Sequence, residues 1–352
     1  MTPAKTTKAK SAISTKNFEN DFGIFNDPNY REGIQQLSTL QPLLDTRENL
    51  AYLAIRESDL KSCKWTAKET DFEEDTVLWN RTHFFHEGAR EIMHCFTAPR
   101  LQIIHSSEIL VIDNSIKDRK GKSMNTIVGD LSMEHIKEAF NEEKKAAENS
   151  KPPRQSKYST RRKYLVNILT KDNELANEVP IVLTLSATAG RMINNALMNF
   201  YRDMDKCMSM AQNLGAAAKY TGDTHAIYVF SPKCAIQKEK NELTQQTYSY
   251  LGIDSVLAPE YNDQESAQQE VYKFTVPKDT WNDVWAQKKD EMLADYINKH
   301  SRQAAHELAG KYGIAEGVPA LMPQGSVQVL PATTDLGPRD QDTGEINLTD
   351  SD

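Results

Sequence analysis

Hydrophobic residues recur at spacings of three and four along residues 187–214, ATAGRMINNALMNFYRDMDKCMSMAQNL. A period near 3.6 with the apolar residues on one side indicates an amphipathic helix that buries that side. We therefore predict one long helix here, with an N-cap at Ser186 or Thr188 and a C-cap at Gly215. Its predicted buried face comprises Met192, Ile193, Ala196, Leu197, Phe200, Met204, Met208 and Ala211.

Shorter apolar runs rich in β-branched and aromatic residues predict strands before this helix. KYLVNILT (163–170) and EVPIVLTL (178–185) are predicted as two strands joined by the polar turn KDNELAN. The earlier block contains TVLWNRTHFF (76–85), AREIMHCFT (89–97) and RLQIIHSSEILVID (100–113). We expect the last of these to be a hairpin that turns at Ser106–Ser107.

The rest of the chain gives further elements. Segment 31–45 predicts a short helix ending before Pro42, because a residue that precedes proline avoids the helical conformation. Segment 52–65 predicts a strand and then a small helix that buries Leu60 and Trp65. Two more strands, 225–232 and 270–277, are expected on either side of a polar loop. A final helix is predicted over 280–300, extending toward Leu308.

About seven strands and two or three helices without regular alternation predict an α+β fold. Consecutive strands favour an antiparallel, partly closed (OB-like) β-barrel or sheet. Residues 114–162 carry little β character and are predicted as an inserted basic arm, with a helix that begins at an N-cap on Ser132. Residues 21–313 form the predicted core domain. Residues 1–20 are an expected disordered basic arm, and 314–352 a Pro-rich stalk with an acidic, disordered tail.

Charge is distributed unevenly along the chain. The net charge is -8, and residues 335–352 contain six acids and one arginine, which leaves about -3 for the rest. Four cysteines have no close sequence partner, and the first seventeen residues contain no apolar segment of a signal peptide. No apolar run approaches the ~18 residues that a membrane span needs. We expect a cytoplasmic protein with reduced thiols.

Catalytic signatures are not evident in the sequence. It contains no phosphate-binding loop, dinucleotide fingerprint or nucleophile elbow. The candidate metal ligands are His83, His86, His94 and Cys95, with Cys63 nearby in sequence. A strand would place His83 and His86 on opposite faces, and no paired cysteine motif supports zinc. We therefore predict no metal, cofactor or catalytic residue.

The strongest signal for function is the basic segment 151–163, KPPRQSKYSTRRK, which carries six cations and no acid. Mobile cations can contact phosphates, and interleaved tyrosines can stack on unpaired bases. The alternative is a solvated linker whose charge serves solubility. The predicted nucleic-acid-binding residues are Lys117, Arg119, Lys120, Lys151, Arg154, Lys157, Tyr158, Arg161, Arg162, Lys163 and Tyr164.

A β-rich body, a basic arm and an acidic tail on a Pro-rich stalk resemble the layout of phage and plasmid single-stranded DNA-binding proteins. In that layout the tail competes with nucleic acid for the basic groove and binds partner proteins. Many such tails end in an aromatic or Pro-Phe pair, whereas this one ends in Leu348-Thr-Asp-Ser-Asp352. The departure puts partner binding through the tail in question.

A second resemblance concerns the sequence itself. LQPLLDTRENLAYLAIRESDLKSCKW, then PRLQII, then VPIVLTLSATAGRMINNALMNFYRDM are similar to an uncharacterised family from filamentous cyanobacteria. The similarity covers about residues 37–210. It departs at Ser62-Cys63-Lys64-Trp65, where the family has Ala-Gly-Trp, and it implies no activity.

We predict a non-enzymatic protein that binds single-stranded nucleic acid, with DNA expected, in the replication or recombination of a phage or plasmid. The expected partners are replication or recombination proteins, which would bind the acidic tail. The chain is also expected to form a homo-oligomer. The alternative is an assembly subunit that oligomerises through its Met-rich helix and the helix carrying Trp281 and Trp285. A nuclease or deaminase that uses His83, His86 and Cys95 ranks third.

Overall fold

The computed structural model describes residues 37–84, 90–117, 121, 123, 125–214, 220, 222–240, 247–299 and 302–313. Its strands are β1 (Thr39–Asp45), β2 (Leu50–Arg56), β3 (Val77–Phe84), β4 (Arg90–Phe96), β5 (Arg100–Ser106), β6 (Leu110–Asp113), β7 (Thr126–Asp130), β8 (Tyr158–Leu169), β9 (Ile181–Ser186), β10 (Val229–Phe230), β11 (Pro232–Lys240) and β12 (Thr247–Val256). Its helices are α2 (Glu134–Asn149), α3 (Ala187–Ala211), α4 (Gly222–His225), α5 (Gln264–Lys273), α6 (Trp281–Lys288), α7 (Glu291–Lys299) and α8 (Arg302–Tyr312). The predicted arms at 1–20 and 314–352 lie outside the described residues.

One large sheet organises the fold, with strand order β10-β5-β8-β9-β1-β2-β4-β3. β6 pairs with the other end of β8, and β7 pairs with β6. The pairing of β1 with β9 is parallel and the other pairings are antiparallel, so the sheet is mixed. The α+β class is confirmed. Among the described strands, the ladder ends at β10 and β3 and does not close into a barrel.

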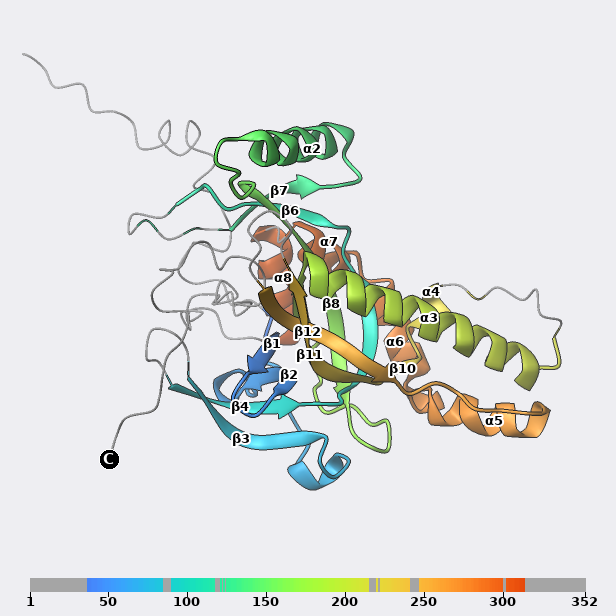
Figure 1. The fold of residues 1–352 in the computed structure, drawn as a ribbon. Helices are drawn as coiled ribbons and strands as arrows, with labels where there is room; N and C mark the ends of the chain where they lie inside the picture. Colours follow the sequence, from blue (N-terminus) through green and yellow to red (C-terminus); the bar gives the residue numbers. More distant parts are fainter. Residues whose placement is uncertain are drawn as a thin grey trace, which may run out of the picture.

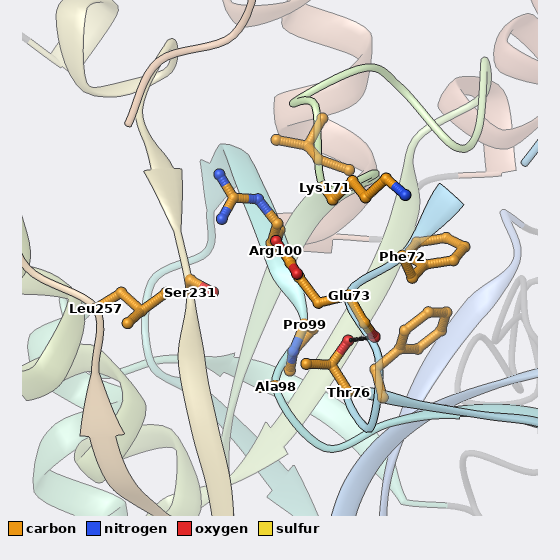
Figure 2. A pocket seen from close by; sticks show the side chains of 11 residues that line it. Phe72, Glu73, Thr76, Ala98, Pro99, Arg100, Lys171, Ser231 and Leu257 are labelled. Carbon is orange, nitrogen blue, oxygen red and sulfur yellow. Dashed lines mark hydrogen bonds between the residues drawn. The ribbon is translucent and has the colours of Figure 1, made fainter. Parts of the chain in front are cut away.

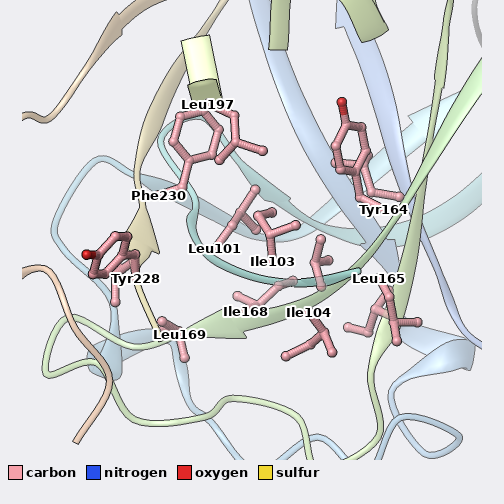
Figure 3. Close-up of a cluster of buried hydrophobic side chains, with 14 of the residues drawn as sticks. Leu101, Ile103, Ile104, Tyr164, Leu165, Ile168, Leu169, Leu197, Tyr228 and Phe230 are labelled. Atoms are coloured by element: carbon pink, nitrogen blue, oxygen red, sulfur yellow. The ribbon is translucent and has the colours of Figure 1, made fainter. Parts of the chain in front are cut away.

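β8 is the central strand of the core. Residues 163–169 are buried without interruption, which requires cover on both faces of the sheet because successive side chains alternate between them. α3 packs on β8 and β9, while α6 and α7 pack on β5 and α7 also on β8 (Figure 1). Figure 3 shows Tyr164 and Leu165 leaving β8 on opposite sides. The sheet is therefore the middle layer between helices.

The hairpin of β11 and β12 forms part of the layer beside α3. β12 packs along that helix, and β11 packs against β2. β11 begins at Pro232, one residue after the end of β10. Cys234 N donates to Thr97 O at 2.7 Å, so the hairpin is hydrogen-bonded to the main sheet where it begins. Figure 1 shows it crossing the molecule beside α3.

Several predicted elements are confirmed. α3 spans most of the predicted helix and buries Ile193, Leu197, Phe200, Met204 and Met208. β8 and β9 are antiparallel neighbours joined by the polar turn, and α2 matches the predicted helix in the insertion. The N-cap of α3 is Ser186 and its C-cap is Gln212, whereas Gly215 lies outside the described residues. α2 begins after Met133, and Ser132 is not its cap.

Two predictions in the first third of the chain are wrong. Residues 39–45 form β1 and not a helix that ends before Pro42. β1 pairs with β9 only through Thr39 and Leu40, so Pro42 needs no amide hydrogen on that side. The segment 100–113 is not a hairpin, because β5 and β6 do not pair with each other. Instead they pair one after the other with β8. Between the two strands, the Ser107 amide donates to Lys163 O at 2.8 Å and so continues the hydrogen bonding with β8.

Predictions in the last third also needed correction. The polar loop before 270 contains the β11–β12 hairpin and α5, and residues 270–273 complete that helix where a strand was expected. Asp263 caps α5 by accepting from Ser266 N at 2.8 Å. The final predicted helix is divided into α6 and α7 near Asp290, and α8 follows. The expected strand over 225–232 is reduced to β10 and the start of β11.

The insertion 114–162 is tied to the sheet along most of its described length and is not a wholly projecting arm. β7 and the first residues of β8 extend the sheet, and α2 packs on both strands. In Figure 1, α2 lies at the margin of the molecule beside β7. No helix within the described residues is long and apolar enough to cross a membrane.

Candidate nucleic-acid interface

The predicted binding residues separate into three groups by exposure. Lys117, Lys151, Arg154 and Lys157 are exposed, and Tyr158, Arg161 and Arg162 are half-buried. Lys163 and Tyr164 are buried, with 6% and 1% of their surface exposed. Arg119 and Lys120 lie outside the described residues. The structure thus brings the first group to the surface and assigns the last to the core.

Strand pairing brings the two basic segments of the insertion together. Asp113 at the end of β6 is the register partner of Tyr158 at the start of β8. Asn114 N then donates to Lys157 O at 2.8 Å, which extends the contact beyond both strands. Lys117 follows three residues later and forms an isolated bridge with Ser123. Lys117 and Lys157 therefore occupy the same margin of the sheet.

Glu143 of α2 fixes the segment that leads into β8. Its carboxylate oxygens accept from Arg154 Nη1 and Nη2 at 2.6 and 3.2 Å, and Oε1 also accepts from Lys157 N at 3.0 Å. The hydrogen bonds from Arg154 and from the Lys157 amide lower the pKa of Glu143 to about 2. The charge of Arg154 is therefore compensated by Glu143, and this ion pair anchors the segment to α2. Its contribution to phosphate binding is reduced by that pairing.

Three exposed lysines of the insertion lack an ion pair within the described residues, although the contact with Tyr158 and the nearby charges of Asp113 and Glu143 raise the pKa of Lys157. Within the described residues, Lys117, Lys151 and Lys157 form no ion pair with a carboxylate. Lys157 Nζ lies 4.8 Å from the centroid of the Tyr158 ring, within the range of a cation–π contact. We call Lys117, Lys151, Lys157 and Tyr158 the basic margin.

Tyr164 and Lys163 serve the core and do not contribute to the basic margin. Burial raises the pKa of Tyr164 to about 12. A ring that is 1% exposed has no face on which a base could stack. The backbone of Lys163 exchanges two hydrogen bonds with Ser107, at 2.8 and 2.9 Å. The sequence did not reveal that these two residues are buried, because they directly follow the exposed cations of the basic segment.

Arg162 lies between the basic margin and α3. Its Nε donates to Ser107 O at 3.1 Å and its Nη1 to Asn194 Oδ1, while the guanidinium lies 6.0 Å from the Tyr164 ring centroid. Both hydrogen-bond acceptors are neutral. The roles of Ser107 and Asn194 were missed from the sequence, because nothing in their local pattern pairs them with an arginine 55 and 32 residues away.

Within the part of the chain that the structure describes, the histidine and cysteine candidates lie apart from one another. His94 stacks on Trp79 at 3.8 Å, and its Nδ1 accepts from Asn80 N at 3.2 Å. His83 Nδ1 lies 3.3 Å from Tyr52 Oη. His86 lies outside the described residues, and no group of three metal-ligating side chains occurs within them.

A pocket of about 140 Å³ lies elsewhere, between the β5 start and the hairpin (Figure 2). Glu73, Arg100 and Lys171 are its charged lining residues. Arg100 Nε donates to Asn173 Oδ1 at 3.1 Å, and Asn173 Nδ2 donates to Lys273 O and Thr275 O at 2.9 Å. The arginine therefore joins the β8–β9 turn to the end of α5 and the residues after it, and we assign the pocket no ligand.

Comparison with known proteins places the sheet, α2, α3 and the hairpin inside one family match. No curated protein and no solved structure matches the chain. A family model matches residues 35–260, more than half of the chain. Helices α5 to α8 follow the matched region, yet Tyr296 of α7 accepts a hydrogen bond from Leu37 N at 3.0 Å and so completes the same core. The chain belongs to the family described as a domain of unknown function, DUF5895.

Proposed function

We propose that this protein is a non-enzymatic binder of single-stranded nucleic acid, with DNA as the expected ligand. The observation that carries the proposal is the basic margin, where Lys157 lies over the half-buried ring of Tyr158 and the exposed Lys117 and Lys151 belong to the same insertion. Lysines supply phosphate contacts that do not depend on sequence, and a tyrosine ring can stack on any base. A role in the replication or recombination of a phage or plasmid, and a kinship with proteins of filamentous cyanobacteria, are part of this proposal.

The arrangement favours a single strand over a duplex. Tyr158 lies at the start of β8, where the strand pairs with β6 but not with β9, because the β8–β9 ladder extends only from Val166 to Arg161. A side chain at such a sheet margin can meet an unpaired base, whereas the bases of a duplex are stacked on one another. An OB-like platform is not needed for this mode of binding.

The decisive experiment is a titration of labelled oligo-dT with the full chain at several salt concentrations. Three phosphate contacts predict a slope of about -2 in the plot of log K against log salt, since each contact to a single strand contributes about -0.7. Substituting alanine for Lys117, Lys151 and Lys157 should flatten this slope and weaken binding. The matched control replaces Lys61, Lys278 and Lys289, which are exposed and lie outside the basic margin.

Equal loss in both triple variants would show that net charge alone governs affinity, and would remove the basic margin from the proposal. Binding with no dependence on salt would reject the proposal itself. A labelled duplex of the same length serves as the second ligand. Weaker binding to the duplex is expected if Tyr158 stacks on unpaired bases.

The alternative, an assembly subunit, has less apolar surface to use than the sequence suggests. The inward stripe of α3 is buried in the core, while Met198 and Met210 of the same helix are 44% and 42% exposed. Trp281 Nε1 donates to Val276 O and Trp285 Nε1 to Asp223 O, each at 3.0 Å, and both rings pack against that core. Light scattering tests the alternative directly, because an oligomer that persists in high salt and ignores DNA would favour it.

A further inference from the structure

One side of α3 is exposed along much of the helix, while its other side packs on β8 and β9. Positions 191, 195, 198 and 202 are four, three and four residues apart, which places their side chains in one row along the helix. Position 199 lies beside this row and is also exposed. We call these residues the outer face of α3: Arg191, Asn195, Met198, Asn199 and Arg202.

Both arginines of the outer face lack a counter-charge. Within the described residues, neither Arg191 nor Arg202 forms a hydrogen bond or an ion pair. α3 contains two carboxylates, and both have other partners. Asp203 pairs with a lysine three residues later at 3.0 Å, and Asp205 Oδ1 lies 3.1 Å from His225 Nε2. The outer face therefore presents two positive charges that favour an anionic partner.

The neutral residues of the outer face favour nucleic acid as that partner. Arg191 and Arg202 are separated by about 16 Å along the helix axis, at the usual rise per residue. Met198 lies between them and is 44% exposed, and the two asparagines are on either side of it in sequence. Arginines hold phosphates, and amides donate to phosphates or base edges. A methionine between them adds a polarizable apolar surface on which a base can pack.

β8 connects the outer face to the basic margin. Arg162 Nη1 donates to Asn194 Oδ1, three residues after Arg191. The Cβ of Arg162 lies 3.6 Å from the position that a Cβ on Gly190 would occupy, so β8 contacts the first turns of α3 (Figure 1). Tyr158 is four residues before Arg162 on the same strand, about 13 Å away at the usual strand rise. One strand of the sheet therefore joins the two surfaces.

We propose that the outer face of α3 is a second contact surface for the single strand bound at the basic margin, with Arg191 and Arg202 holding backbone phosphates. This inference rests on the proposed function and deepens it, because it fixes the direction in which the nucleic acid leaves the margin. The stretch of β8 from Tyr158 and the stretch of α3 to Arg202 add up to about 30 Å. An oligonucleotide too short for that path contacts the margin alone.

The first experiment titrates the full chain with labelled oligo-dT of increasing length, each at several salt concentrations. Lengths from about 4 to 16 nucleotides cover the usual site sizes of single-strand-binding domains. The shortest oligonucleotide that binds should keep the slope of about -2, whereas one that spans both surfaces should steepen it by about 1.4, because it adds two phosphate contacts. Additional binding registers on a longer oligonucleotide raise affinity but not the slope. A slope that is equal at all lengths would overturn the proposal.

The second experiment removes both charges of the outer face in the variant Arg191→Gln/Arg202→Gln, in which the new side chains are still good helix formers. Its binding to the longest oligonucleotide should weaken about tenfold at low salt and its slope should flatten by about 1.4, while binding to the shortest should not change. The matched control Lys278→Gln/Lys289→Gln removes two exposed charges outside both surfaces and should change neither. Both variants should keep the Tm of the unsubstituted chain, because neither arginine has a partner in the described fold.

The outcomes distinguish this inference from the proposed function. If the basic margin binds a single strand and α3 does not, the arginine variant binds long oligonucleotides as well as its control does, and this inference alone is rejected. If the proposed function is wrong, no oligonucleotide of any length shows salt-dependent binding. A labelled duplex tests the remaining case. Loss of duplex binding without loss of oligo-dT binding in the arginine variant would assign α3 to paired nucleic acid and overturn the single-strand path.

Discussion

The two ends of β8 differ in strand pairing, in burial and in the charges beside them, although one continuous strand contains both. From Tyr158 to Thr160 the strand pairs with β6 alone, its side chains are half-buried, and exposed lysines precede it. From Tyr164 to Val166 it pairs with β5 and β9 together, and each of these side chains is at most 1% exposed. The number of neighbouring strands, more than the composition of the segment, sets which side chains of β8 remain exposed.

This comparison changes how a run of cations is interpreted. Arg161, Arg162 and Lys163 are consecutive in sequence with the cations before them, but they belong to the part of β8 where pairing and burial increase. A long aliphatic stem allows such residues to pack while the charged group hydrogen-bonds. Substitutions in the buried end should therefore affect stability, and substitutions at the exposed end should affect binding.

The largest effect is expected for Leu165→Ala in the buried end. Leu165 is fully buried, and removing its branched side chain would leave a cavity between β8 and its neighbours (Figure 3). Such changes typically lower the free energy of unfolding by about 2–5 kcal/mol. Denaturant unfolding measures this loss, while oligo-dT affinity below the unfolding transition should be unchanged. A stability loss below about 1 kcal/mol would contradict the central position of β8 in the core.

A smaller loss is expected for Asn167→Ala, which interrupts a buried chain of amides. Asn167 Nδ2 donates to Gln102 Oε1 at 2.9 Å, and Asn167 Oδ1 accepts from Asn177 Nδ2 at 3.0 Å. The variant leaves both partners without this hydrogen bond in a buried site, at a cost of about 1–3 kcal/mol. Denaturant unfolding again provides the measurement. Lys171→Ala, at an exposed residue just beyond β8, is the control and should cost much less.

The same contrast explains what the sequence could predict. The stripe on α3 and the apolar runs of β8 and β9 were predictable, because each buries a face whose periodicity is visible locally. The β11–β12 hairpin was missed because its outer positions are polar, and few of its residues, such as Tyr250 and Leu251, are buried. Residues 270–277 were taken for a strand because Val271, Tyr272 and Phe274 favour one, whereas the Asp263–Ser266 capping box begins a helix there.

The candidate site was predictable only in part, for a related reason. Composition identified the cations of 151–163, but it did not reveal that Arg154 pairs with Glu143 of α2, eleven residues earlier. Burial of Lys163 and Tyr164 depends on β5 and β9, which are distant in sequence.

A moderate effect on binding is expected when residues 335–352 are removed. This segment carries a net charge of -5 and would compete with nucleic acid for the basic margin. Truncation after Thr334 should therefore tighten oligo-dT binding several-fold at low salt, and the gain should shrink as salt screens the competition. The control replaces the six acids of the tail by their amides in the full-length chain. Unchanged affinity in both variants would contradict competition by the tail.

The smallest and most specific effect is expected for Glu143→Gln at the exposed end. The neutral amide can no longer hold Arg154 as an ion pair, so a fourth cation becomes available and the salt slope for oligo-dT should steepen by about 0.7. The pKa of Glu143 is lowered from 4.5 to about 2, so its stabilisation is fully present above pH 4.5 and is lost as pH falls toward 2. Unfolding measured across that range should therefore show an acid-dependent loss in the unsubstituted protein that is smaller in Glu143→Gln. Glu148→Gln, on the same helix but paired only loosely with Lys144 at 4.0 Å, is the matched control and should change neither the slope nor the acid dependence. If both variants steepened the slope equally, the overall charge of α2 would govern binding, and the release of Arg154 would not explain the effect.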